Sequence, residues 1–216
     1  MIYFSQLFIA FLLDIFFGDP HWYPHPVRIM GKICDFSESF TRKYIASDML
    51  AGMVTVLTVT VSSGTIALLL VTTAYSVAPL LGDIVSIVLF YTTIAAKDLL
   101  RHSNIVYTFL TDENSLDNAR QALGQIVGRD TQELSKEEVS KACIETVAEN
   151  MVDGITAPLF FGIFAGMASP FLPISPIGCS VVGAFVYKSV NTLDSMIGYK
   201  NDIYIENLNQ QCQVPE

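Results

Sequence analysis

The sequence predicts an all-α, polytopic integral membrane protein. Hydrophobic residues make up 51% of its 216 residues and charged residues only 15%, whereas about 25% of the residues in a typical soluble domain are charged. The hydrophobic residues are also gathered into long blocks, and a membrane-spanning helix needs about 20 such residues in succession. We therefore expect residues 1–216 to form a single membrane domain with about five apolar segments.

The apolar segments are expected at about residues 2–17, 50–78, 83–97, 155–172 and 174–187. The first has no basic residue before it and no small-residue cleavage site, which favours a retained transmembrane segment over a cleaved signal peptide. The first, fourth and fifth are short for a full span, and prolines and glycines interrupt the last two. That last pair fits either two tilted spans or a re-entrant hairpin packed in protein.

The basic residues predict the topology. All twelve lysines and arginines fall between the first and second segments, between the third and fourth, or after the fifth, and the other two connections contain none. Cytoplasmic loops of membrane proteins are enriched in Lys and Arg. We therefore expect a multi-pass protein of the cell membrane, with its N-terminus outside and its motif-bearing loops in the cytoplasm.

The longest polar stretch, 98–153, is expected to be a helical cytoplasmic loop. Ser115 can cap a helix that Gly128 would end, and Ser135 with Glu138 forms an S-x-x-E capping box for a second helix. Residues 201–216 are polar and are expected to form a tail.

The charge and the cysteines exclude several classes of function. The net charge of -9 argues against nucleic-acid binding, which needs a basic face. The four cysteines are far apart and form no CxxC, so ordinary reduced thiols are expected and not a zinc site or a disulfide framework. The sequence also lacks the GxxxxGK[ST], GxSxG and HExxH motifs.

Three carboxylates fall at four-residue spacing just before the fourth apolar segment. On a continuous helix, Glu145, Glu149 and Asp153 share one face. Such a stripe is often a solvated helix face, but like charges four residues apart destabilise a helix, and Asp153 is the last charge before the apolar run. Carboxylates at a membrane boundary also suit Mg²⁺, which takes oxygen ligands and often bridges to phosphates. Both interpretations stay open on the pattern alone.

A proline-rich loop follows the first apolar segment, in the stretch GDPHWYPHPVRIMGK. One interpretation is a connecting loop with aromatic residues at the membrane interface. The other is a polar clamp, in which Arg28 meets a phosphate or carboxylate and Asp19 or His25 serves metal or proton chemistry. Asp14 lies inside the preceding apolar segment, where an acid is a functional candidate by default.

Two further stretches combine polar groups. In KSVNTLDSMIGYKND, helical spacing puts Lys188, Asn191 and Asp194 on one face, although an ordinary juxtamembrane helix also has such residues. In GRDTQEL, Arg129 and Asp130 lie in a turn between helices, where an arginine beside a helix N-terminus suits an anion.

The four motifs occur in an order that resembles a known family. The stretches LLDIFFGDPHWYPHPVRIMGK, GRDTQEL, ETVAENMVDGITAPLFF and YKSVNTLDSMIGYKN are similar to those of the adenosylcobinamide-phosphate synthase (CobD/CbiB) family of cobalamin biosynthesis. The resemblance covers about residues 7–201. It implies a membrane enzyme that uses ATP and Mg²⁺ to join aminopropanol, or its O-phosphate, to the free propionate of adenosylcobyric acid as an amide.

The resemblance also implies roles for residues. Glu149 and Asp153 would hold Mg²⁺, with Asp194 as a third ligand and Glu145 nearby, and Lys188 would neutralise charge on an acyl phosphate. Such a phosphoryl transfer depends mainly on positioning and charge neutralisation.

The remaining motif positions would bind substrates or move a proton. Arg28 and Arg129 would contact ATP or the aminopropanol phosphate, and Asp130, next to Arg129, would also bind substrate. Asn150 and Asn191 would orient the substrate. The general base for the attacking amine would be Asp19 or His25, in a loop that Asp14 supports.

Two departures from the family pattern bear on activity. The fourth and fifth apolar segments are joined by an extra apolar stretch, and the chain lacks the C-terminal third that members typically carry. We expect a truncated form, a fragment, or one half of a split enzyme. Its partners would then be the bilayer, other corrinoid-pathway enzymes, or the missing C-terminal half. An ion-coupled transporter and a non-catalytic corrinoid-binding remnant are the alternatives.

Overall fold

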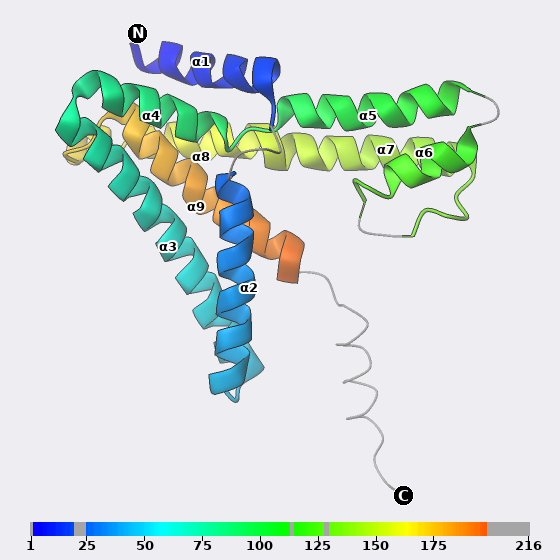
Figure 1. The fold of residues 1–216 in the computed structure, drawn as a ribbon, viewed down its shortest axis with the longest axis horizontal. Helices are drawn as coiled ribbons and strands as arrows, with labels where there is room; N and C mark the ends of the chain where they lie inside the picture. Colours follow the sequence, from blue (N-terminus) through cyan, green and yellow to red (C-terminus); the bar gives the residue numbers. More distant parts are fainter. Residues whose placement is uncertain (1, 20–24, 113–114, 128–129, 198–216) are drawn as a thin grey trace, which may run out of the picture.

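The computed structural model describes residues 2–19, 25–112, 115–127 and 130–197, and over these ranges the regular elements are all helices (Figure 1). The all-α class is therefore confirmed. The tail predicted at 201–216 and the aromatic residues of the proline-rich loop lie outside the described residues. The elements in chain order are α1 (Ile2–Phe17), α2 (Pro26–Tyr44), α3 (Asp48–Val77), α4 (Pro79–Tyr91), α5 (Ala96–Thr111), α6 (Leu116–Leu123), α7 (Lys136–Met151), the π-helical turn η1 (Val152–Thr156), α8 (Ala157–Gly166), the 3₁₀ turn η2 (Ser169–Phe171) and α9 (Pro176–Ile197).

Three helical stretches are long and apolar enough to cross a membrane by length and composition: Asp48–Val77, Pro79–Thr111 and Lys136–Phe171. The apolar helix α1 is shorter. The membrane character of the protein is thus confirmed, and each of the five predicted apolar segments forms a helix or part of one. The third ends earlier than predicted, because the chain leaves the helix after Tyr91 and begins α5 only at Ala96.

The membrane helices pack around α9. Side chains from α1, α3, α4 and α9 share one buried core, and α8 turns back on α9 as an antiparallel hairpin closed by η2. The two helices approach closely at Gly183, where a Cβ atom would lie 2.4 Å from the Cβ of Ala165 and 2.7 Å from the backbone oxygen of Phe161. Small residues allow such close approach between membrane helices. This helix pair is compatible with both arrangements that the sequence leaves open, two tilted spans and a re-entrant hairpin.

Helices α5, α6 and α7 form an arm that extends from this bundle (Figure 1). The arm has a core of its own, made of Val106, Ala119, Leu123, Val139 and Ala142. The capping box of α7 is confirmed: Ser135 Oγ accepts the Glu138 backbone N–H, and the Glu138 carboxylate accepts the Ser135 N–H.

Helix α6 is shorter than predicted. It ends at Leu123, and Gly128 lies outside the described residues. The Ser115 side chain does not cap the α6 backbone, because its hydroxyl donates to the Asp112 carboxylate at 2.6 Å.

The helix that carries the acidic stripe continues into the membrane segment, but not as a uniform α-helix. Five residues of π-helix, Val152–Thr156, separate α7 from α8. A π-turn closes its hydrogen bonds over five residues in place of four. Asp153 therefore leaves the line set by Glu145 and Glu149, and the stripe predicted from four-residue spacing is broken at its third member.

Candidate functional site

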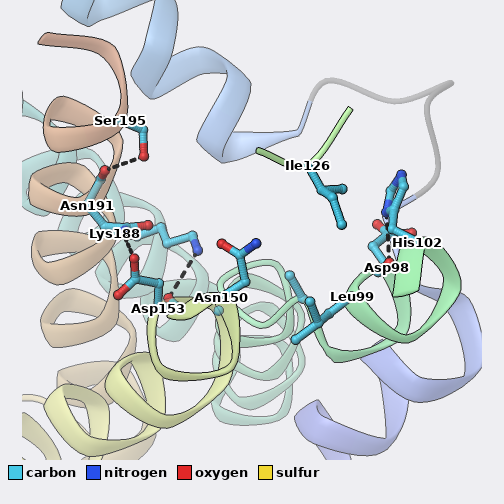
Figure 2. A pocket seen from close by; sticks show the side chains of 11 residues that line it. Asp98, Leu99, His102, Ile126, Asn150, Asp153, Lys188, Asn191 and Ser195 are labelled. Carbon is cyan, nitrogen blue, oxygen red and sulfur yellow. Dashed lines mark hydrogen bonds between the residues drawn. The ribbon is translucent and has the colours of Figure 1, made fainter. Parts of the chain in front are cut away.

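Two adjoining cavities lie where α2, α5, η1 and α9 meet. The first is about 210 Å³ and the second about 270 Å³. They share three lining residues: Ala95, Asp98 and Lys188. The first cavity, drawn in Figure 2, is otherwise lined by Leu99, His102, Ile126, Asn150, Asp153, Gly154, Asn191 and Ser195. The second is otherwise lined by Asp19, His25, Val27, Arg28, Thr92, Thr93 and Ile94.

The π-turn presents Asp153 to α9. One carboxylate oxygen of Asp153 accepts the side-chain amide of Asn191 at 2.9 Å, and the other accepts the hydroxyl of Tyr187 at 3.2 Å. The Lys188 ammonium donates to the backbone oxygen of Asp153 at 3.4 Å (Figure 2). The backbone oxygen of Gly154 accepts the Ala95 N–H at 2.9 Å, which ties the π-turn to the start of α5. π-turns inside α-helices are frequent at functional sites. This one lines the first cavity and is bonded to both α9 and the start of α5.

Lys188 is the cation common to both cavities. It follows the apolar part of α9 and is only partly exposed. Burial lowers the pKa of its ammonium, and the negative charges of Asp153 and Asp19 act in the opposite direction. A lysine between two carboxylates keeps its charge more readily than an isolated buried one. The site therefore holds a cation within reach of both cavities.

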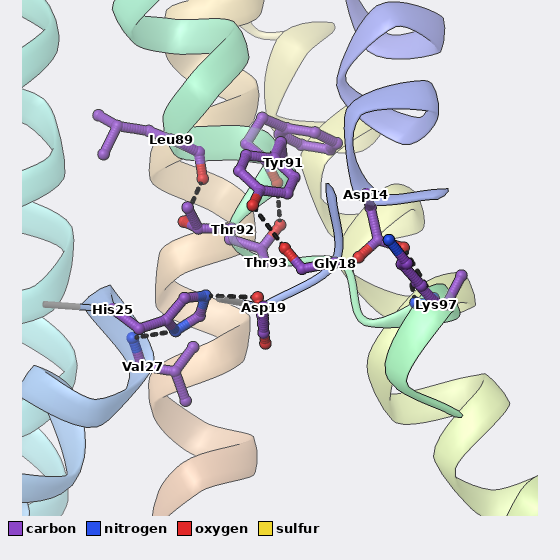
Figure 3. Close-up of polar contacts among 12 residues, drawn as sticks. Asp14, Gly18, Asp19, His25, Val27, Leu89, Tyr91, Thr92, Thr93 and Lys97 are labelled. Carbon is purple, nitrogen blue, oxygen red and sulfur yellow. Dashed lines mark hydrogen bonds and ion pairs between the residues drawn. The ribbon is translucent and has the colours of Figure 1, made fainter. Parts of the chain in front are cut away.

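The proline-rich loop places Asp19 and His25 at the second cavity (Figure 3). His25 is buried and caps α2, because its Nδ1 accepts the Val27 N–H at 3.3 Å. The other ring nitrogen, Nε2, lies 2.9 Å from Asp19 Oδ1. The two predicted general bases therefore lie next to each other at the second cavity.

Asp14 lies behind the site. It is fully buried, and its Oδ2 accepts the backbone N–H groups of Ala96 at 2.8 Å and Lys97 at 3.2 Å (Figure 3). The first N–H groups of a helix lack partners within that helix, so Asp14 of α1 caps α5. It was predicted among the substrate-binding residues, but it lines neither cavity. Its role of supporting the loop is the one that these contacts fit.

A glycine completes the support of this loop. Gly18 has a φ of +62°, and its oxygen accepts the Tyr91 hydroxyl. A Cβ atom here would lie 2.8 Å from Lys97 Cδ. Only glycine adopts this backbone conformation without strain. The loop therefore leaves α1 in one defined direction, toward the second cavity.

The structure brings together seven of the predicted site residues at the two cavities: Asp19, His25, Arg28, Asn150, Asp153, Lys188 and Asn191. It adds residues that the sequence analysis did not select: Asp98, His102, Thr92, Thr93 and Ser195. Asp98 and His102 lie four residues apart, just after an apolar segment. The acidic stripe has the same four-residue spacing, so this pair carries a comparable signal in the sequence.

Other predicted residues lie elsewhere. Glu145, Glu149 and Asp194 are exposed and line neither cavity. Among the described residues, no group of three His, Cys, Asp or Glu side chains is placed to hold a metal ion. Of the four carboxylates predicted to hold magnesium, Asp153 is the one that lines a cavity. Asp130 accepts the Gln132 N–H in a surface turn, and Arg129 lies outside the described residues.

Comparison with known proteins identifies the family. Residues 7–207 match the family model described as CobD/Cbib protein. The chain belongs to the CobD/CbiB family. It is 41% identical over 204 residues to cobalamin biosynthesis protein CobD of Desulfotalea psychrophila, covering 93% of this chain and 61% of that relative.

Two other family members show similar identity and coverage. CobD of Leptospira interrogans is 42% identical over 197 residues, covering 91% of this chain and 58% of the relative. Cobalamin biosynthesis protein CbiB of Salmonella arizonae is 40% identical over 199 residues, with the same coverage. The chain thus spans about three-fifths of the length of the curated relatives it matches. No solved structure matches it.

Proposed function

We propose that this CobD/CbiB chain forms part of an ATP-dependent amide ligase of cobalamin biosynthesis. The enzyme joins an aminopropanol unit, as its O-phosphate or free, to the propionate of adenosylcobyric acid. The observation that carries the proposal is the pair of adjoining cavities, which share a cation, Lys188, and a carboxylate, Asp98. A two-substrate ligation needs such contiguous sites, since its reacting atoms must come within about 3–3.5 Å of each other.

The reaction proceeds in two steps. The propionate oxygen first takes the terminal phosphoryl group of ATP, which forms an acyl phosphate and ADP. The amine nitrogen then attacks the acyl carbon, a C–N bond forms, and the C–O bond to phosphate breaks. The substrate ammonium loses two protons in all: one leaves on the phosphate and the other is released to solvent.

The residues of the first cavity suit the activation step. Phosphoryl transfer depends on positioning and on neutralising the charge of the phosphate oxygens. The ammonium of Lys188 supplies that charge, and the amides of Asn150 and Asn191 supply hydrogen bonds that orient the acid. Tyr187 and Asn191 hold the Asp153 carboxylate in a fixed orientation.

ATP and Mg²⁺ fit the site as a substrate complex. Mg²⁺ usually keeps several waters and binds through one or two carboxylates together with substrate phosphates. Asp153 of the first cavity would supply such a carboxylate. Within the described part of the chain, the residues support an ion that arrives with the nucleotide better than a resident ion held by three or more ligands. Glu149 and Asp194 remain proposed outer contributors, whereas the exposed Glu145 lies 3.9 Å from Lys141.

The topology is part of the proposal. Both cavities draw on connections rich in Lys and Arg, which belong to the cytoplasmic side by the charge rule. ATP would then enter from the cytoplasm, and the N-terminus would lie outside. The transporter alternative rests on Asp14 as an intramembrane ionisable group. The capping contacts of Asp14 explain its position structurally, without a role in transport.

The test is conversion of adenosylcobyric acid in membranes that contain this chain, with ATP, Mg²⁺ and aminopropanol phosphate, followed by mass spectrometry. A full-length relative is assayed in parallel. We expect product from the chain, and its loss in Asp153→Asn but not in Glu145→Gln. Corrinoid binding without product would indicate the non-catalytic remnant, and flux without ATP turnover would indicate a transporter.

A further inference from the structure

We propose that the second cavity binds the amino alcohol substrate as a zwitterion: Asp19 and Asp98 receive its ammonium, and Arg28 receives its phosphate. This inference rests on the proposed function and assigns one of the two substrates to one of the two cavities.

The cavity presents both signs of charge. Arg28 lies in the first turn of α2, directly after the His25 cap, and Lys188 projects from α9. Asp19 lies in the loop before α2, and Asp98 lies in the first turn of α5. A guanidinium binds phosphate oxygens through its fork of N–H donors, and a carboxylate is the natural acceptor for an ammonium. A small molecule with a phosphate at one end and an ammonium at the other matches this lining.

The wall around the two carboxylates is rich in acceptors. The hydroxyls of Thr92 and Thr93 donate to the backbone oxygens of Leu89 and Phe90, each at 2.7 Å (Figure 3). A hydroxyl that donates to the backbone offers only its lone pairs to a ligand. Asp19 adds its carboxylate to this wall, with Oδ1 2.9 Å from His25 Nε2. An ammonium has three donors and no acceptor, so this wall suits it better than a neutral alcohol.

The size of the cavity favours the smaller substrate. At about 270 Å³, it falls just below the range of about 300–1,000 Å³ that holds drug-sized ligands. An aminopropanol phosphate is smaller than such ligands, whereas a corrinoid is far larger. The cavity is therefore matched to the amino alcohol, and the corrinoid would present only its propionate to the first cavity.

The shared wall places the amine where it must react. Asp98 and Lys188 line both cavities. An ammonium held by Asp98 therefore lies at the junction, facing the position of the acyl carbon in the first cavity. Asp98, absent from the motif-based selection, becomes a binding residue for the attacking amine.

The experiment measures binding to the chain in lipid nanodiscs, with neither ATP nor corrinoid present. Three probes are compared by calorimetry: 1-amino-2-propanol O-phosphate, isopropyl phosphate, which lacks the amine, and 1-amino-2-propanol, which lacks the phosphate. We expect the zwitterion to bind wild type at least tenfold more tightly than either single-charge probe, because each hydrogen-bonded charge pair is worth at least about a factor of ten.

Variants assign each end of the ligand. Asp19→Asn and Asp98→Asn are expected to weaken the zwitterion at least tenfold and to leave isopropyl phosphate unchanged. Arg28→Gln is expected to weaken both phosphates and to leave the free amino alcohol unchanged. Matched controls on the exposed surface of α2, Arg42→Gln and Asp35→Asn, should bind all three probes as wild type does.

The results can overturn the inference without help from the ligase assay. If wild type binds the zwitterion and isopropyl phosphate with equal affinity, the carboxylates do not bind the ammonium, whatever affinities the variants show. Loss of both phosphates in Asp19→Asn would mean that the site has collapsed around a structural residue. If the expected pattern appears but no product forms in membranes, the binding assignment stands and the ligase proposal fails.

Discussion

Replacing Asp14 by alanine tests whether this acid supports the site or touches a substrate. In the structure its Oδ2 accepts two backbone N–H groups at the start of α5, at 2.8 and 3.2 Å, in a fully buried position. Asp14→Ala leaves both donors without a partner. Hydrogen bonds to charged groups are worth about 1.5–3 kcal/mol each, but the variant also removes the cost of burying a carboxylate. We therefore expect a net loss of about 2 kcal/mol in unfolding free energy.

The assay is thermal unfolding in detergent micelles, combined with ligase activity below the transition. For a chain of this length, about 2 kcal/mol corresponds to a fall in Tm of about 4–8 °C. Asp14→Asn keeps an oxygen for Ala96 and should lose about half as much. Ser5→Ala, on the exposed face of the same helix, is the control and should change stability by less than about 0.5 kcal/mol.

The outcome that refutes this reasoning is specific. If Asp14→Ala unfolds at the wild-type temperature yet makes no product, Asp14 acts on a substrate, as the motif alone suggested. A lower Tm with activity recovered on cooling agrees with the capping role. The Asp14→Asn variant separates the two cases further, because an amide can cap a helix but cannot carry a negative charge.

Three further expectations follow from the same geometry. Asp153→Asn should lower ligase activity at least 100-fold and leave the Tm within about 3 °C of wild type, because the amide keeps the shape of the side chain but not its charge. Unchanged activity would remove Asp153 from the mechanism. Gly18→Ala should lower the Tm by about 2–8 °C, since a residue with a side chain at positive φ costs about 1–2 kcal/mol and its Cβ would meet Lys97; a wild-type Tm would show that this loop relaxes freely. Glu145→Gln should leave product formation within twofold, because the 3.9 Å pair with Lys141 is exposed and such pairs contribute about 0–1 kcal/mol; lost activity would return Glu145 to the metal site.

The helices were largely predictable because their signals are local. A run of apolar residues predicts a membrane helix whatever surrounds it, and the Ser135 capping box lies within four residues. The early end of α4 was not predictable in this way. The chain leaves that helix at Thr92 and Thr93, whose side chains bond back to the preceding turn, and no proline or glycine marks the break.

The site was predictable only in part, because its contacts are distant in sequence. Asp153 was selected as the last acid before an apolar run, and it does line a cavity. Asp14 bonds to residues more than 80 positions away, so spacing along the chain could not reveal its capping role. Asp98 lines both cavities together with residues of α9 and of the loop before α2. These segments are distant in sequence, so helical periodicity could not predict that they meet.

The π-turn also acts on the helix that contains it as a change of phase. An α-helix advances about 100° per residue, and a π-turn accommodates one residue more than an α-turn. The faces of α7 and α8 are therefore rotated by about 100° relative to a single uninterrupted helix. One continuous rod can then turn one side to α5 in the arm and another to α9 in the bundle. Deleting a single residue between 152 and 156 would restore the uniform phase, and the arm and the bundle could no longer both keep their partners.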